Sequence, residues 1–263
     1  MTNPPAQSTT SFWSYTLSQE RKKFITYTLL LVIASALLTM WAIQYNTGSS
    51  PNKLGGRPQA WVIVLPAVLY GVWLTGCRRR FADLTLRSFA AAKGYQFTAQ
   101  DNYGASYGLP DYKIKNDSPQ ISDVVTGTLD RTPFRLCRYK IPYGQSYAYG
   151  TLLDLTVSRQ LPPALFAGPT RHRGYLTLVR DYGGPHQVSL SNAPKGFVLY
   201  APEDSDEAAR AIFSTDTLSF MQQAFSNYTI RTAPGHMYIY VKERSPSQKS
   251  LDQLFALATQ LLG

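Results

Sequence analysis

Residues 75–84 read TGCRRRFADL, and the chain changes character there. The preceding residues, 59–77, carry no charge, whereas the residues that follow the arginines include charges of both signs. A helix over residues 59–77 would span about 28 Å, close to the hydrocarbon thickness of a bilayer, about 30 Å. Three consecutive arginines after such a stretch are typical of a membrane helix that ends at the cytoplasmic surface.

A second uncharged stretch lies upstream, at residues 24–45, and reads FITYTLLLVIASALLTMWAIQY. As a helix it would span about 33 Å, which is enough to cross a bilayer. It is too long for the apolar part of a cleaved signal peptide, and Met40-Trp41 is a poor cleavage site. A buried helical hairpin in a soluble protein is the other alternative, but the basic residues that flank both stretches favour a membrane hairpin.

Basic residues near the two stretches predict the orientation, because they accumulate on the cytoplasmic side. The connecting loop, residues 46–58, contains only Lys53 and Arg57. The other side holds six basic residues, which are candidate membrane-anchor and anionic-lipid contacts: Arg21, Lys22, Lys23, Arg78, Arg79 and Arg80. Both termini are therefore predicted to lie in the cytoplasm, at the inner face of the plasma membrane.

The predicted organisation has three parts. A cytoplasmic tail, a transmembrane hairpin and a cytoplasmic domain cover residues 1–23, 24–77 and 78–263, and the membrane helices cover residues 24–45 and 59–77. The net charge of +10 does not favour a nucleic-acid partner, because residues 81–263 hold 18 Lys or Arg against 15 Asp or Glu, a balance of only +3. Cys77 and Cys137 lie far apart and have neither disulfide-framework nor metal-ligand spacing.

The domain after the arginines is predicted to be α+β, a mostly antiparallel sheet packed by C-terminal helices. The predicted strands are 122–129, 133–141, 149–158, 175–179, 187–190, 196–200, 228–232 and 237–242, and the predicted helices are 79–93, 204–213, 216–226 and 247–262. Asp130-Arg131-Thr132 predicts one hairpin turn and Pro234-Gly235 another, of type II.

Local patterns add three expectations. Leu153, Leu155 and Val157 alternate with polar residues that begin at Asp154, which predicts a strand with one solvated face. Residues 161–166, LPPALF, contain two prolines, so a short helical turn is expected there rather than a strand. Asp204 and Glu207 have the spacing of a helix capping box.

The sequence contains no recognised catalytic motif, and it predicts neither a cofactor nor a metal. His172, His186 and His236 occur singly, without the spacing of metal ligands. Cys137 lies between Arg135 and Arg138, which would favour a thiolate nucleophile, although a packed residue in a sheet is the favoured interpretation. The strongest candidate for an anion contact in the domain is Arg171-His172-Arg173, with a solvated loop as the alternative.

Residues 195–222, KGFVLYAPEDSDEAARAIFSTDTLSFMQ, are followed by YTIRTAPGHMYIYV at 228–241. Together with VTGTLDRTPFRL at 125–136, they resemble a bacterial family of membrane proteins that have two N-terminal membrane helices and a cytoplasmic α+β domain of unknown function. The resemblance covers residues 80–243 and implies the same topology and fold. It supplies no catalytic residue.

These observations favour a membrane-tethered interaction module that binds a protein or an anionic lipid at the inner leaflet. A membrane-bound enzyme with an unrecognised active site is the first alternative, and an oligomeric transport component is the second. The identity of the partner and the oligomeric state stay open at this point.

Overall fold

The structure, a computed structural model, forms two compact units, Met1–Ala82 and Asp83–Gly263, which are described separately. The described residues are 12–46, 61–100, 120–143, 146–167, 186–190, 193, 196–213, 215–224, 228–243 and 245–263.

The first unit is helical. Its helices are α1 (Phe12–Gln19), α2 (Arg21–Asn46) and α3 (Trp61–Lys93). The predicted helix at 79–93 is therefore the continuation of α3, which extends past the boundary of the unit. Large apolar side chains are exposed along α2 and α3: Ile25, Leu29, Leu30, Val32, Ile33, Leu37 and Met40 on α2, and Val68, Leu69 and Val72 on α3. Over the residues that the structure describes, no helix has both the length and the apolar character needed to cross a membrane.

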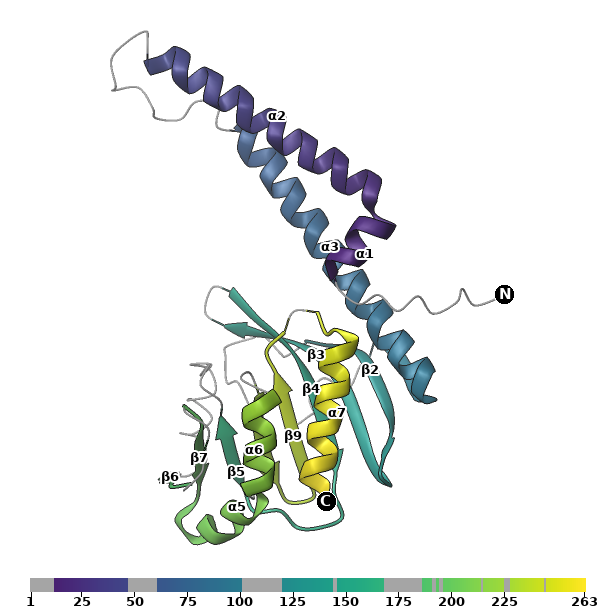
Figure 1. The fold of residues 1–263 in the computed structure, drawn as a ribbon, viewed down its shortest axis with the longest axis vertical. Helices are drawn as coiled ribbons and strands as arrows, with labels where there is room; N and C mark the ends of the chain where they lie inside the picture. Colours follow the sequence, from purple (N-terminus) through teal and green to yellow (C-terminus); the bar gives the residue numbers. More distant parts are fainter. Residues whose placement is uncertain are drawn as a thin grey trace. The chain divides into compact units, whose positions relative to one another are not determined.

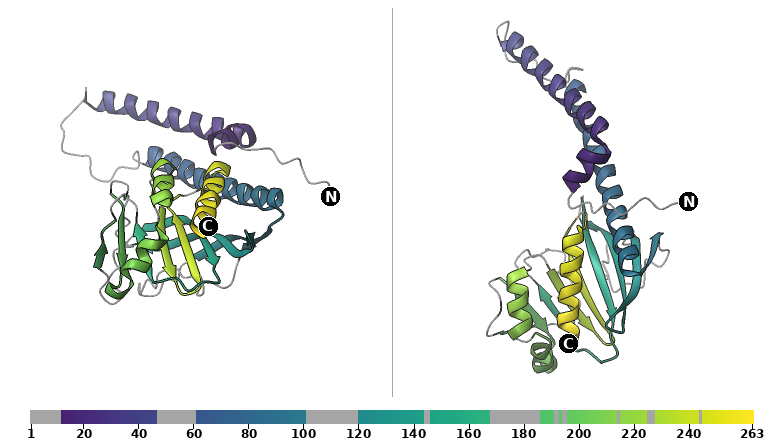
Figure 2. Two further views of the ribbon diagram at one scale, coloured as in Figure 1. Left: turned by 60° about the horizontal axis from the view of Figure 1, so that its bottom comes forward. Right: turned by 45° about the vertical axis from the view of Figure 1, so that its right-hand side comes forward.

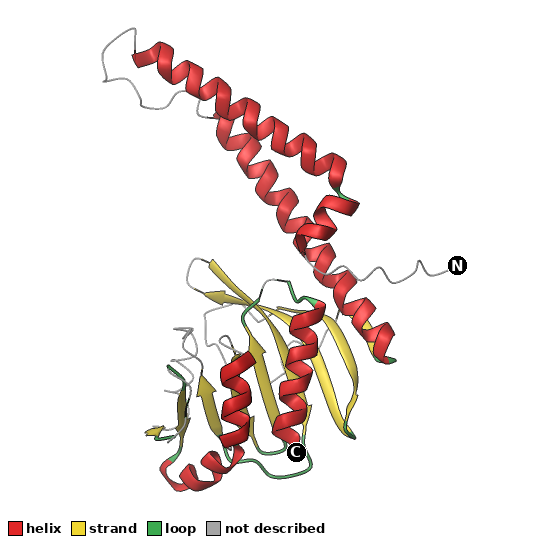
Figure 3. Cartoon of the chain, in the orientation of Figure 1, coloured by secondary structure: helices red, strands yellow, loops and turns green. Residues whose placement is uncertain are grey.

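The second unit contains one antiparallel sheet, which confirms the predicted α+β class. Within the described residues it has nine strands in the order β1-β2-β3-β4-β9-β8-β5-β7-β6 (yellow in Figure 3). Their bounds are β1 Gln96–Gln100, β2 Gln120–Leu129, β3 Thr132–Tyr143, β4 Ser146–Thr156, β5 Ala164–Ala167, β6 His186–Val188, β7 Val198–Ala201, β8 Tyr228–Ala233 and β9 His236–Val241. The C-terminal hairpin β8–β9 lies between β4 and β5, although it comes last among the strands in sequence.

Both predicted hairpins are confirmed. Asp130 and Arg131 join β2 to β3 with positive φ angles of 48° and 70°, the conformation of a two-residue hairpin turn that follows the twist of the strands. Gly235 joins β8 to β9 with a φ of 76°, as a type II turn requires.

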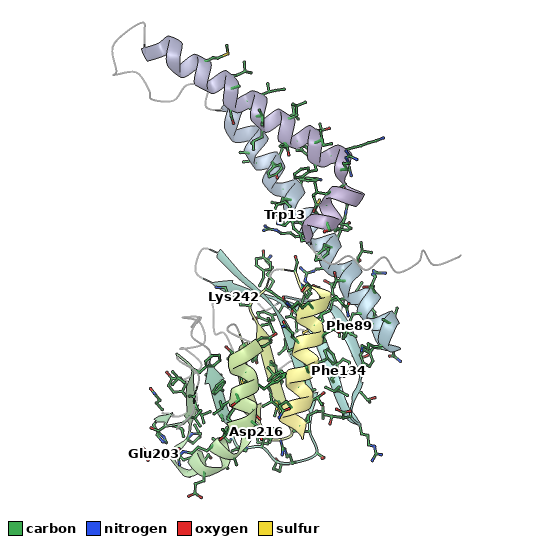
Figure 4. All side chains as sticks on the ribbon, in the orientation of Figure 1. Trp13, Phe89, Phe134, Glu203, Asp216 and Lys242 are labelled. Atoms are coloured by element: carbon green, nitrogen blue, oxygen red, sulfur yellow. The ribbon has the colours of Figure 1, made fainter. Side chains whose placement is uncertain are left out.

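Helices cover one face of the sheet, where most of the core lies. The C-terminal helices are α5 (Asp206–Ile212), α6 (Thr215–Ala224) and α7 (Gln248–Leu262), and a 3-10 helix, Glu203–Ser205, precedes α5. α6 and α7 lie side by side on the sheet, as Figure 1 and Figure 2 show from different directions. Phe89, from the end of α3, and Phe134, from β3, both pack on Phe255 of α7, at ring-centroid distances of 5.0 Å (Figure 4). The core is therefore built from segments distant in the sequence.

Two predictions of local secondary structure are wrong. Residues 164–167 form strand β5 instead of a helical turn, because Pro162 and Pro163 precede the strand and leave its ladder donors intact. The expected capping box at Asp204 is absent from the described structure, since α5 begins after Ser205 and has no side-chain cap. The predicted strand at 175–179 lies outside the described residues.

Candidate functional site

The short helix α1 packs against α3 within the first unit. The rings of Phe12 and Tyr15 lie 5.8 Å and 5.7 Å from that of Phe81. Tyr15 and Thr16 are buried there, as is Cys77 on α3. Burial also raises the pKa of the Tyr15 phenol, and the nearby Glu20 carboxylate raises it further. The described part of the N-terminal tail is thus an ordered helix with one packed side.

Glu20, between α1 and α2, forms ion pairs with two of the predicted basic residues. Its carboxylate lies 3.1 Å from Lys23 Nζ and 2.7 Å from Arg80 Nη1. The contact with Arg80 joins residues 60 positions apart, so sequence spacing could not have revealed it. The Arg78 guanidinium lies over the Phe12 ring, 5.5 Å from its centroid.

Three of the predicted basic residues are both exposed and outside the ion pairs with Glu20. Arg21, Lys22 and Arg79 are exposed, and none of them forms an ion pair with another described residue. We refer to these three residues as the open basic group. They are the members of the predicted set best placed to meet an external anion, because the charges of Lys23 and Arg80 are already opposed by Glu20.

Aromatic residues cluster around Trp73, on the same two helices as the open basic group. The Trp73 ring on α3 lies 6.1 Å from Phe24, 5.4 Å from Tyr27 and 5.6 Å from Tyr70. Tryptophan and tyrosine favour the boundary between lipid and water. On α1, Trp13 and Leu17 are 53% and 49% exposed.

In the second unit, the sheet face opposite α6 and α7 is also buried and rich in tyrosine. It comprises Ile121, Val124, Cys137, Tyr139, Leu152, Tyr238 and Tyr240. Cys137 is 0% exposed, which removes the support for it as a nucleophile and agrees with a packed residue. No described helix covers this second face.

A polar row crosses the second face, and the sequence analysis missed it. The strand register places Arg135, Asp154, Tyr238 and Arg231 opposite one another on β3, β4, β9 and β8. Asp154 Oδ1 lies 3.0 Å from His236 Nδ1, and the His236 ring stacks on Tyr238 at 5.5 Å with an interplanar angle of 2°. The Arg231 guanidinium lies 5.8 Å from the centroid of Tyr238.

Asp154 was expected on a solvated face, but its residue is only 5% exposed. Burial raises the pKa of this carboxyl, while the hydrogen bond and charge of His236 and the charge of Arg135 oppose the increase. The hydrogen bond fixes the orientation of the imidazole. Its clearest role is to give the buried carboxyl a partner.

His186 occupies a second histidine–carboxylate pair. Its Nε2 lies 2.9 Å from Asp206 Oδ1, and Arg210 Nη2 lies 3.3 Å from the other oxygen of the same carboxylate. Arg210 Nε also donates to the carbonyl of Ser189 at 3.3 Å. The contacts connect the edge strand β6 to α5. Within the described residues no group of three or more His, Cys, Asp or Glu side chains could hold a metal ion.

The predicted anion contact at residues 171–173 and a surface recess beside α7 do not extend the candidate site. The anion candidates Arg171, His172 and Arg173 lie outside the described residues. A surface recess of about 410 Å³ lies beside the end of α7, with Asp130 and Arg159 among its lining residues. Arg159 Nη2 there donates to the carbonyl of Leu261 at 3.1 Å, so this guanidinium helps to hold the end of the helix.

Glu243 contacts the start of α7. Its Oε1 accepts a hydrogen bond from Thr151 Oγ1 at 3.2 Å. Burial raises the pKa of the Glu243 carboxyl, against the opposing effect of hydrogen bonds from Ser250 and Thr151. The folded state therefore takes up a proton at higher pH than the unfolded chain does. The stabilisation that comes with protonation of Glu243 is fully present below the pKa of the carboxyl in the unfolded chain, about 4.3. It is lost as the pH rises through the pKa of the carboxyl in the folded state.

We therefore expect Glu243→Gln to stabilise the sheet unit at pH 7.5 relative to the wild type, and to lose that advantage towards pH 4.5. The amide keeps an oxygen for Thr151 but cannot ionise. Urea unfolding of the full chain in detergent, followed by near-ultraviolet circular dichroism, measures the difference at each pH. Glu207→Gln, at an exposed position on α5, is the control and should shift little with pH. A Glu243→Gln effect that is the same at both pH values would contradict the assignment.

Comparison with known proteins gives a likeness of fold. No protein-family model matches the chain, and no curated protein matches it. Among solved structures, the chain is similar to the crystal structure of the mycobacterial trehalose monomycolate transport factor A, TtfA, with a TM-score of 0.50. The match covers 70% of this chain and 95% of that chain, at 11% sequence identity. What the two proteins share at this identity is therefore the fold.

Proposed function

We propose that this chain is a membrane-tethered interaction module that binds a protein or an anionic lipid at the inner leaflet. Residues 24–45 and 59–77 would cross the membrane, and the sheet unit would lie in the cytoplasm. Parts of these two stretches lie outside what the structure describes: residues 59 and 60 and the side chains at 38–39, 41–45 and 61–66.

One observation carries the proposal: the exposed apolar side chains of α2 are bounded at one end by basic residues. Seven large apolar residues between Ile25 and Met40 are 47–65% exposed, an arrangement that is unfavourable in water and suited to lipid. The basic residues at the start of α2 and after residue 77 suit the anionic headgroups of the inner leaflet. The predicted family resemblance, with its two membrane helices, supports the same layout.

The test is extraction of membranes from cells that express the full chain. We expect the protein to stay in the membrane pellet after washing with high salt and with alkaline carbonate. Ile33→Asp combined with Leu37→Asp should release most of it, because each charge at the centre of a membrane helix costs roughly 2.5–3.5 kcal/mol. Ala208→Asp with Ala211→Asp, at exposed positions on α5, adds the same charge elsewhere and should stay in the pellet. Release of the wild type by either wash would overturn the membrane hairpin.

Transport is the second candidate function, and the similar fold of the mycobacterial transport factor favours it. In that case the sheet unit would act beside a transport system. The enzyme alternative has less support, because Cys137 is buried. Crosslinking at the inner leaflet, followed by mass spectrometry of the full chain, distinguishes these roles by the partner that it captures.

A further inference from the structure

We propose that α1 lies in the plane of the inner leaflet, where Trp13 and Leu17 enter the boundary between headgroups and acyl chains. The open basic group, Arg21, Lys22 and Arg79, would bind the phosphates of anionic phospholipids beside it. The inference rests on the proposed membrane anchor and gives that anchor a specific lipid-binding surface.

One side of α1 is already occupied, and this fixes which side is available. Tyr15 is 4% exposed and Thr16 is 0% exposed, and the Tyr15 ring lies 5.7 Å from the Phe81 ring of α3. Thr16 Oγ1 also donates to the Phe12 carbonyl at 2.9 Å, within the helix. The helix is thus held by its own unit, and its other side is presented to the surroundings.

The presented side carries two large apolar residues. Trp13 and Leu17 are one helical turn apart, so they share a face, and each is about half exposed (Trp13 is labelled in Figure 4). The sequence of α1, FWSYTLSQ, contains no charged residue at all. A tryptophan and a leucine on the free side of an uncharged helix are typical of a helix that lies in a membrane interface.

The charges select an anionic surface as the occupant of this face. Glu20 is the only acidic residue among residues 1–82, and it is engaged by Lys23 and Arg80. The open basic group therefore has no acidic residue of this segment left to neutralise it. Arg21 and Lys22 follow Glu20 directly in the sequence, and Arg79 precedes the Arg80 that contacts Glu20. Phospholipid phosphates complement these three cations better than an apolar protein groove does, because the groove would leave their charges unmatched.

Fluorescence quenching by brominated lipids tests the placement. The full chain would carry Trp41→Phe, Trp61→Phe and Trp73→Phe, which leaves Trp13 as the only tryptophan, in vesicles of phosphatidylcholine and phosphatidylglycerol. A matched variant would keep Trp73 and replace the other three. We expect bromines high on the acyl chain to quench Trp13 more than bromines near the chain end do.

The outcomes separate the inference from the anchor. Quenching of Trp73 without quenching of Trp13 would overturn the inference and leave the membrane anchor intact. If neither is quenched, the anchor itself fails. Trp13→Phe in the otherwise native chain provides a second measurement that does not need the triple replacement. It should remove the part of the wild-type quenching that bromines high on the acyl chain produce.

Lipid selectivity tests the basic residues. In the chain with Trp13 alone, bromine carried on phosphatidylglycerol should quench at least about twofold more than bromine carried on phosphatidylcholine at equal mole fraction. Replacing Arg21, Lys22 and Arg79 by Gln should bring that ratio close to one. Replacing Arg131, Lys242 and Lys249 by Gln, at exposed positions of the sheet unit, should leave it unchanged. A ratio that survives the first replacement would overturn the assignment of the open basic group.

Discussion

Replacing Gly150 by valine is expected to destabilise the sheet unit by about 3 kcal/mol or more, although valine is a better strand former than glycine. Gly150 lies in β4 opposite Tyr139 of β3. A Cβ atom at this position would collide with the Tyr139 hydroxyl and with the backbone carbonyl oxygen of Val241. The second contact is with backbone in a central strand, so it cannot be relieved by a change of rotamer.

The measurement is urea unfolding of the full chain in detergent, monitored by near-ultraviolet circular dichroism of the sheet unit. Thr156→Val is the control, since it introduces the same residue at an exposed position of the same strand and should change stability by less than about 0.5 kcal/mol. Strand propensity alone predicts that both substitutions stabilise. A Gly150→Val protein as stable as the wild type would mean that β3, β4 and β9 leave room for a side chain at this position.

Replacing Phe134 by alanine has the second large expected effect, a loss of about 3–5 kcal/mol. The ring is 2% exposed and makes edge contacts with two other rings, Tyr95 at 4.8 Å and Phe255 at 5.0 Å. Truncation would leave a cavity between β3 and α7 and remove both aromatic contacts.

Phe134→Leu keeps most of the volume and should cost less than about half as much in the same unfolding measurement. Phe255→Ala should overlap with Phe134→Ala, so the double variant should lose less than the sum of the two single losses. Additive losses would show that the two rings do not share one cluster.

The sequence predicted the elements whose signals are local. The final helix, α7, follows from its apolar stripe, and the β2–β3 and β8–β9 turns follow from Asp130-Arg131 and Pro234-Gly235. Strand β5 was missed because the two prolines were read as part of the element that follows them. The pairing of β5 with β8 depends on residues about 65 positions later, which no local pattern contains.

In the candidate site, too, features with a local sequence signal were predictable and features that depend on distant residues were not. The six basic residues were found from their positions beside uncharged stretches. Their division into paired and open members depends on Glu20 reaching Arg80 across 60 residues. Asp154 was assigned to a solvated face because alternation indicates which face of a strand a residue occupies, but not what covers that face. Its neighbours His236 and Tyr238 come from β9, 82 positions away in the case of His236.

The position of the C-terminal hairpin has a consequence for synthesis. Strands β1 to β4 are sequential neighbours and can pair as soon as they leave the ribosome, but β4 then waits for β9. About 85 residues separate the end of β4 from the end of β9, which corresponds to roughly 4–17 s of translation. During this interval the edge of β4 is an open template for strands of other chains. The nascent protein is therefore most prone to aggregation just before its last hairpin emerges. Insertion of that hairpin pairs the open edge of β4 and completes the sheet.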